Sequence, residues 1–213
     1  MNNEQKNMAR YNGPKNRLAR REGMDLGLKT VGSKSHATLL KRMGIMPGQH
    51  GTKGHRKMSD FGIQLREKQK VKRLYGVLER QFRKTFGNAM KWKGNTGEKL
   101  LEFMERRLDN VVYRMGFSPT RGLARQLVSH GHVLVDGKKV NIPSYEVQKD
   151  TVITLGSTGL GIPAVKKMLD DKSLTTPSWI ERKGPVGKVV RLPERTDITE
   201  DINEQLIVEH YSR

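Results

Sequence analysis

Cysteine is absent from this chain of 213 residues. Without cysteine the chain can form no disulfide, no thiolate-ligated zinc site, no cysteine-ligated iron–sulfur cluster and no thiol nucleophile. It also lacks any apolar run close to the roughly 18–20 residues that a membrane-spanning helix needs. The first seven residues contain no apolar stretch typical of a signal peptide. These absences together favour a soluble intracellular protein without a membrane partner.

Hydrophobic residues are scarce, at 34% of the chain, whereas glycine is frequent, with 22 residues. A chain with few apolar side chains has little surface to bury in a core of its own. We therefore expect part of it to be ordered by contact with a partner.

Positive charge is abundant and unevenly placed. The net charge is +19, and residues 1–96 hold 23 lysines and arginines against 6 acidic residues, or +17. Residues 97–160 carry +2, and residues 161–213 carry no net charge. A concentrated field of one sign attracts a polyanion. An anionic membrane surface is the alternative partner, but it requires a helix with a broad apolar face. The basic segments are interleaved with Gly, Asn, Gln and His instead, so nucleic acid is favoured.

The N-terminal region predicts short helical turns at residues 17–22 and 35–42, then a glycine-rich loop at 44–57. Glycines such as Gly48 permit close backbone approach in this loop, and Gln49 and His50 offer hydrogen-bond donors. A long helix over residues 60–86 should follow, with Phe61 in its apolar stripe. Only two acidic residues are available to pair with its opposite face, which favours a phosphate-binding face over a merely solvated one. That face carries Arg66, Lys68, Lys70, Lys72, Arg73, Arg80 and Arg83.

The central region predicts two helices, over residues 98–115 and 118–130, the second capped by Ser118. A hairpin at residues 132–142 turns at Asp136-Gly137. Strands at 151–155 and 188–192 and a terminal helix at 198–211 complete the pattern. The helices should pack on the hairpin and present Arg121, Arg125 and Ser129 on one surface suited to phosphates.

Sequence signals for catalysis are missing. There is no GxSxG, HExxH or Walker loop. The glycines at 156, 159 and 161 follow a strand, but Pro163 and the spacing argue against a dinucleotide site. His130 and His132 lack a third nearby ligand, which favours a polar or RNA-facing role over a metal site. The two tryptophans are interpreted as core or hinge residues rather than as stacking platforms. We predict no enzyme activity, no cofactor and no metal.

The order helix–Gly–Ser–helix–Gly–hairpin over residues 107–140 resembles the RNA-binding module of the ribosomal protein S4 family. Similar modules occur in pseudouridine synthases, tyrosyl-tRNA synthetases and a heat-shock ribosome-recycling protein. A synthase needs a separate catalytic domain after the module, and the 58 residues that follow Leu155 are too few for one. Segments outside the module also resemble the bacterial-type S4 family, namely Arg10-Tyr-Asn-Gly-Pro, Arg20-Arg-Glu-Gly, Pro47-Gly-Gln-His-Gly, Ser59-Asp-Phe-Gly-Ile, Tyr75-Gly-Val-Leu and Asn203-Glu-Gln-Leu.

The resemblance implies an α+β protein of two domains. The first is a basic, mainly helical domain of residues 1–97, completed by the C-terminal segment 196–213. The second, residues 98–195, is the inserted RNA-binding module, with two helices packed on a small, mostly antiparallel sheet. Zinc is not implied, because Asn16 and Ala19 stand where some family members carry Cys-x-x-Cys.

In function, the resemblance implies a structural constituent of the small ribosomal subunit in the cytoplasm. It implies direct binding to the 5′ domain of 16S-type ribosomal RNA, which nucleates assembly of the subunit body. Further implications are a contribution to translational accuracy, contact with ribosomal protein S5 (uS5) and with messenger RNA where it enters, and translational repression of its own operon.

The residues predicted to bind RNA come from both domains. We expect Arg125→Glu to weaken RNA binding and leave the fold intact, because Arg125 lies off the apolar stripe of its helix. The full predicted set is Arg10, Arg20, Arg21, Gly48, Gln49, His50, Arg66, Lys68, Lys70, Lys72, Arg73, Arg80, Arg83, Arg107, Ser118, Arg121, Arg125, Gln126, Ser129, His130, His132, Lys138 and Lys139.

Overall fold

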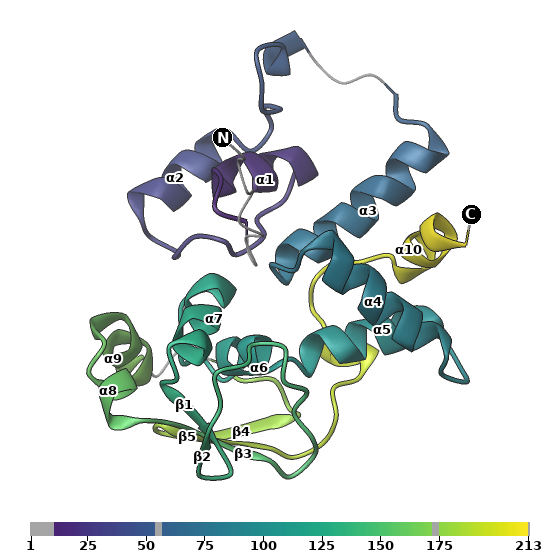
Figure 1. Ribbon diagram of the computed structural model, residues 1–213. Coiled ribbons are helices and arrows are strands. Elements are labelled where there is room, and N and C mark those ends of the chain that lie inside the picture. The colour runs from purple at the N-terminus through teal and green to yellow at the C-terminus, as the bar shows by residue number, and fades with distance from the viewer. Residues whose placement is uncertain (1–10, 54–56, 172–174, 213) are drawn as a thin grey trace, which may run out of the picture.

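The computed structural model describes residues 11–53, 57–171 and 175–212, which form helices and one sheet (Figure 1). The α+β class is confirmed. The helices are α1 (Lys15–Glu22), α2 (Lys34–Lys41), η1 (Gly51–Lys53), α3 (Asp60–Leu74), α4 (Glu79–Met90), α5 (Thr96–Glu105), α6 (Leu108–Arg114), α7 (Arg121–Ser129), α8 (Ser157–Leu160), α9 (Pro163–Asp170), η2 (Arg195–Asp197) and α10 (Glu204–Tyr211). The strands are β1 (Val133–Val135), β2 (Lys138–Lys139), β3 (Val152–Leu155), β4 (Ile180–Lys183) and β5 (Val186–Val189).

The sheet has the order β2-β1-β3-β5-β4, and every neighbouring pair is antiparallel. The predicted hairpin is confirmed: Asp136 (φ 47°) and Gly137 (φ 78°) make the turn between β1 and β2 with two positive φ angles. The Asp136 carboxylate also accepts a hydrogen bond from Val152 N at 2.8 Å, which ties the turn to β3. Strand β4, with Glu-Arg-Lys in three of its four positions, was not anticipated, and neither were α8 and α9.

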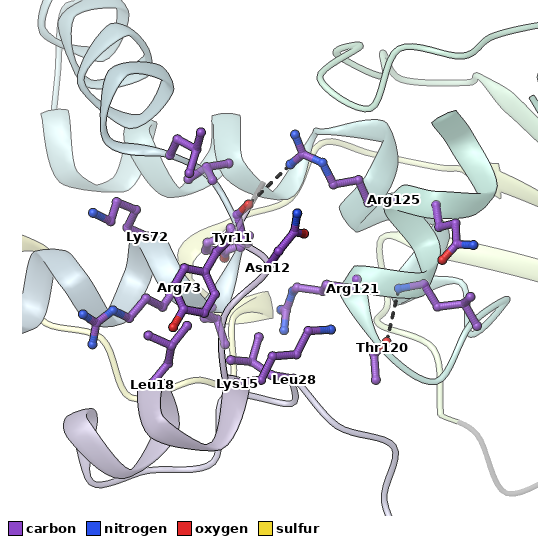
Figure 2. Close-up of a pocket in the computed structure, with 18 of the residues that line it drawn as sticks. Tyr11, Asn12, Lys15, Leu18, Leu28, Lys72, Arg73, Thr120, Arg121 and Arg125 are labelled. Carbon is purple, nitrogen blue, oxygen red and sulfur yellow. Dashed lines mark hydrogen bonds between the residues drawn. The ribbon is translucent and has the colours of Figure 1, made fainter. Parts of the chain in front are cut away.

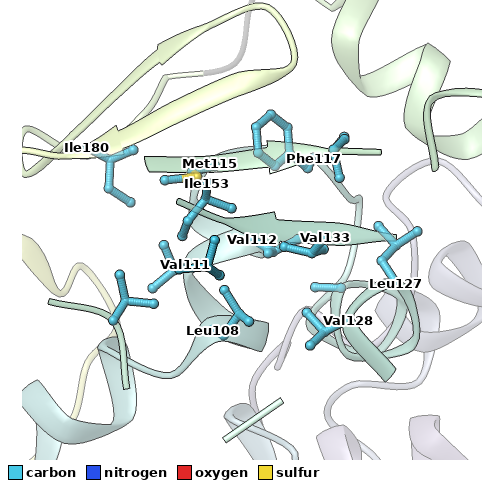
Figure 3. Close-up of a cluster of buried hydrophobic side chains, with 14 of the residues drawn as sticks. Leu108, Val111, Val112, Met115, Phe117, Leu127, Val128, Val133, Ile153 and Ile180 are labelled. Carbon is cyan, nitrogen blue, oxygen red and sulfur yellow. The ribbon is translucent and has the colours of Figure 1, made fainter. Parts of the chain in front are cut away.

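Two hydrophobic cores organise the chain. The sheet core lies where α6 and α7 cover one face of the sheet, and Figure 3 shows side chains from these helices meeting those of the strands. The helical core is built by α1, α2, α3, α4, α5 and α10, so that the two ends of the described chain share it. Ile207 of α10 is fully buried there.

The helix expected over residues 60–86 is two helices. It breaks at Gly76 (φ +63°), where Gly76 N donates to Arg73 O and Val77 N donates to Lys72 O, closing the end of α3. The apolar stripe was also wrong in part, since Phe61 is 49% exposed while Gln64 and Lys68 are buried.

The helix expected over residues 98–115 also breaks, at Arg107, which has an extended backbone (ψ 135°) and forms a β-bridge with Glu146. The break divides one apolar stripe between two cores. Leu100 and Met104 belong to the helical core, whereas Leu108 belongs to the sheet core.

The cap of α7 differs from expectation. Thr120, rather than Ser118, caps α7 by accepting from Leu123 N at 3.2 Å. Of the two tryptophans interpreted as core or hinge residues, Trp179 is buried in the sheet core, and Trp92 is 59% exposed in the connection between α4 and α5.

Candidate RNA-binding surface

The cations of α3 are paired with acidic side chains. Glu79 binds both Lys68 and Lys72, with Nζ–Oε distances of 2.8 and 2.9 Å. Lys70 pairs with Glu67 at 2.7 Å. The inference that most of these charges lack an acidic partner was therefore wrong for α3. Glu79 reaches two of its lysines across the break between α3 and α4.

The remaining arginines of α3 converge on α1. Arg66 and Arg73 both form ion pairs with Glu22, whose side chain is only 1% exposed. Burial raises the pKa of Glu22, and the two arginines act against that rise. At Glu79, burial also raises the pKa, but hydrogen bonds from Lys68, Lys72 and Tyr211 outweigh it and lower the pKa to about 2. No sequence spacing reveals the pairs made by Glu22, because that residue belongs to another helix.

Arginines gather around a hollow of about 330 Å³ beside α1 and α3. It brings together three residues that the sequence predicts as RNA ligands, Arg21, Arg66 and Arg73, and adds Arg17. Arg20, on the same helix, instead donates from Nε to Ile45 O at 2.9 Å and from a terminal nitrogen to Met46 O at 3.1 Å. It thereby fastens the loop that precedes Gly48 to α1.

A buried ionic cluster joins the two cores. Glu105 accepts hydrogen bonds from Tyr75 Oη at 2.7 Å and from Arg114. Glu200 pairs with Arg114 and with Arg121, each at 2.8 Å. Burial raises the pKa of Glu200, but the two arginines outweigh it and lower the pKa to about 2. Arg121 is thus 7% exposed, and the expectation that it stands on the surface was wrong.

Several other residues of the module that were predicted to bind RNA are buried or already bonded to groups within the protein. Arg107 donates two hydrogen bonds to Asp109, at 3.1 and 2.8 Å, and Ser118 is buried and donates to a backbone carbonyl. Arg125, with a side chain 15% exposed, lies 3.5 Å from Asp109 and 3.4 Å from the carbonyl oxygen of Gly76. These contacts within the protein show that all three side chains help to hold the fold together.

The other predicted residues lie at the surface, apart from Arg10, which is outside the described residues, and the half-buried His132, whose ring lies 6.1 Å from that of His130. Exposed positions come from α1, the 48–50 loop, α4, α7 and the β1–β2 hairpin. They are Arg21, Gly48, Gln49, His50, Arg80, Arg83, Gln126, Ser129, His130, Lys138 and Lys139.

A cleft of about 550 Å³ lies between helices α1 and α3 on one side and α7 on the other (Figure 2). It has a leucine-rich floor and a cationic rim. Sequence reasoning missed Tyr11, Asn12 and Lys15 as site residues, although the Arg10-Tyr-Asn-Gly-Pro motif contains two of them. Its lining residues are Tyr11, Asn12, Lys15, Leu18, Leu28, Gln69, Lys72, Arg73, Leu74, Tyr75, Gly76, Val77, Leu78, Thr120, Arg121, Gly122, Leu123, Arg125 and Gln126.

Neither a metal site nor a membrane span is found in the described part of the chain. Within residues 11–53, 57–171 and 175–212, no three His, Asp or Glu side chains are grouped so that they could hold a metal ion. No helix in these ranges is both long and apolar enough to cross a bilayer.

Comparison with family models places this architecture in a class. Residues 10–105 match the ribosomal protein S4/S9 N-terminal domain, and residues 106–153 match the S4 domain. The two matches define a ribosomal protein that carries an S4 domain.

The particular family follows from individual relatives. The chain is 50% identical over 208 residues to the small ribosomal subunit protein uS4 of Dictyoglomus turgidum and to that of Dictyoglomus thermophilum. It is 49% identical over 213 residues to the protein of the same name from Aeromonas hydrophila. Each match covers 97% of this chain and 100% of the relative. The chain belongs to the uS4 family. This family is structural rather than enzymatic, so the prediction of no enzyme activity is confirmed.

Proposed function

We propose that this chain is a structural protein of the small ribosomal subunit that binds small-subunit ribosomal RNA and so resides in the ribosome, in the cytoplasm. Membership of the uS4 family, with the match running over nearly the whole chain, is the observation that carries the proposal. The concentration of net charge on residues 1–96 supports a polyanionic partner.

We divide residues that the sequence predicts as RNA ligands into two groups by their burial. The first group contacts the phosphates of the folded RNA, because its members can do so without giving up a buried partner. It consists of the exposed cations and hydrogen-bond donors of α1, α4, α7, the 48–50 loop and the β1–β2 hairpin. The buried Lys68, Arg107, Ser118 and Arg121 instead hold the surface in place through their internal contacts. Removing a residue of the second group should therefore affect folding before it affects RNA affinity.

The proposed domain boundary lies between residues 105 and 106 rather than between 97 and 98. Leu100, Leu101 and Met104 of α5 contribute to the helical core, and Leu108 is the first residue of the sheet core. On the C-terminal side, Ile198 returns to the helical core. The module thus extends over residues 106–193, and the segment that follows it completes the first domain.

Finer roles follow from the family resemblance and are proposals for this chain. They are binding to the 5′ domain of the ribosomal RNA, nucleation of subunit assembly, a contribution to accuracy, contact with uS5 and messenger RNA, and repression of its own operon. Crosslinking within purified subunits tests the two contacts, and an absence of crosslinks to uS5 would contradict the first of them.

Binding of the full chain to a transcript of the 5′ domain, measured across a salt series, tests the central proposal. A protein that neutralises about six phosphates should lose about a thousandfold in affinity between about 50 and 200 mM salt. An unrelated RNA of equal length is the control. Equal affinity for both RNAs, or no dependence on salt, would contradict the proposal.

A further inference from the structure

We infer that the cleft between α1, α3 and α7 holds one unpaired nucleotide of the bound RNA, with its base on the leucine floor and its phosphate at the cationic rim. The inference rests on the proposed function, because RNA is the source of the nucleotide. It goes further in assigning a distinct pocket and the chemical class of its occupant.

The floor of the cleft suits the flat face of a base. Leu18 of α1, Leu74 at the end of α3, Leu78 before α4 and Leu123 of α7 all line it. The volume of about 550 Å³ falls within the range of about 300–1,000 Å³ that is usual for small organic ligands. A base in a duplex keeps both faces stacked, so only an unpaired base can enter such a pocket.

The rim of the cleft suits a phosphate. Of the described residues that line it, five are cationic and none is acidic. Lys72 is held by Glu79, Arg73 by Glu22 and Arg125 by Asp109, so acids outside the lining orient these cations. Because no acidic side chain lines the cleft, a phosphate at the rim meets cationic donors and no carboxylate.

Lys15 extends the rim over the start of α7. Its Nζ lies 3.2 Å from the position that a Cβ on Gly122 would occupy. Gly122 and Thr120 lie at the N-terminal end of α7, where the helix dipole favours a negatively charged group. Figure 2 shows Lys15 and Arg121 on facing sides of the cleft.

The cleft also has amide side chains that match the hydrogen-bonding edge of a base. Asn12, Gln69 and Gln126 line the cleft, and each amide offers both a donor and an acceptor, as the edge of a base requires. Arg121 is already stacked between rings, with its guanidinium carbon 4.5 Å from the Tyr113 ring centre and 5.2 Å from that of Tyr75. Because its Nε and one terminal nitrogen donate to Asn110 and Glu200, this guanidinium is a fixed wall of the cleft.

Filling the cleft tests the inference. Leu123→Trp places an indole on the floor, and Leu40→Trp, on the exposed face of α2, is the matched control. With the 5′-domain transcript as probe, the first variant should bind about tenfold more weakly, the value expected for loss of one stacked base. The control should bind as the wild type does, and thermal unfolding should show both variants folded.

A second pair of variants keeps the test independent of packing. Gln126→Ala removes one amide of the rim, and Gln81→Ala removes an exposed amide of α4 outside the cleft. We expect a threefold or greater loss of affinity for the first alone.

Transcripts with a single abasic nucleotide at each unpaired position complete the design. One position should weaken wild-type binding about tenfold and weaken the Leu123→Trp variant no further, since both changes remove the same contact.

Two results would overturn the inference while leaving the proposed function intact. One is normal affinity of a folded Leu123→Trp variant. The other is that, at every position, the losses of affinity caused by the abasic nucleotide and by Leu123→Trp simply add. Failure of the wild type to prefer the transcript over unrelated RNA would instead overturn the proposed function. Occupation of the cleft by free mononucleotides at micromolar concentration, without loss of transcript affinity, would overturn RNA as the source.

Discussion

Lysine and arginine serve two separate purposes in this chain, and their burial distinguishes the two. Arg80 and Lys138 are exposed and available to a partner, whereas Lys68 and Arg121 are 6% and 7% exposed and are held by Glu79 and Glu200. A buried charge that loses its partner is strongly destabilising, whereas an exposed charge is not. The same substitution should therefore lower stability in the buried group and RNA affinity in the exposed group.

Arg121→Met should destabilise the fold. It leaves Glu200 with one arginine instead of two and should lower the free energy of unfolding by about 3 kcal/mol, measured by urea denaturation. Arg80→Met is the control, with unchanged stability and weaker RNA binding. Equal stability of the two variants would contradict the role assigned to the ionic cluster.

The stability of the protein should fall in acid because of Glu200. Its pKa is lowered from 4.5 to about 2 in the folded state, so its contribution is present above about pH 4.5 and is lost as the pH falls toward 2. Urea denaturation at pH 6 and pH 3 should show a smaller loss for Glu200→Gln than for the wild type. Parallel losses in the two proteins would show that Glu200 is not a source of the acid sensitivity.

Arg125 needs a gentler substitution than charge reversal. Arg125→Glu would place a second carboxylate beside Asp109, so we now expect it to destabilise the fold as well as to weaken RNA binding. Arg125→Gln should stay folded, bind RNA more weakly and reduce the slope of log affinity against log salt by about one. An unchanged slope in a folded variant would remove Arg125 from the proposed contacts.

At the scale of elements, local chemistry made some structures predictable and tertiary contacts decided the others. Asp136-Gly137 predicted the hairpin because its turn depends only on the two residues that occupy it. The stripe from Leu100 to Met115 correctly predicted burial, but it could not show that the chain leaves one core and enters another at Arg107. Likewise, the α3 cations were correctly placed on one helix, and their partner Glu22 was beyond any local pattern.

The break between α3 and α4 provides a test at this scale. Gly76 has φ +63° and open space around the position of a Cβ, so Gly76→Ala should lower the free energy of unfolding by about 1 kcal/mol through backbone strain alone. Gly87, inside α4 with equally open space and an ordinary helical φ, is the matched control. Gly87→Ala should raise stability by about 0.5–1 kcal/mol in the same chemical denaturation assay. Changes of the same sign would contradict this account of the break.

At the scale of the whole molecule, the last described helix belongs to the first part of the chain. Gln64 of α3 donates to Glu209 at 2.9 Å, and the backbone N–H of Asn203 donates to Glu67 at 2.9 Å. The Tyr211 ring stacks on Phe86, with ring centres 4.5 Å apart. The helical core is therefore closed by residues more than a hundred positions away, an arrangement that periodicity along the sequence cannot reveal.

Removal of α10 should separate the two cores experimentally. A chain that ends at Asn203 loses Ile207 and should lose amide exchange protection in α3 and α4, while β1, β3 and β5 stay protected. A chain shortened only to Tyr211 is the control and should exchange as the full protein does. Equal loss of protection in the sheet would show that the two cores unfold as one unit.

The position of α10 also fixes an order of events during synthesis. The sheet core draws on one continuous stretch of chain, so its contacts can form while later residues are still being added. The helical core starts with the first helices made, yet it stays open until Ile207 has emerged from the ribosome that is making it. The basic part of the protein is thus synthesised first, yet its core is completed after that of the sheet.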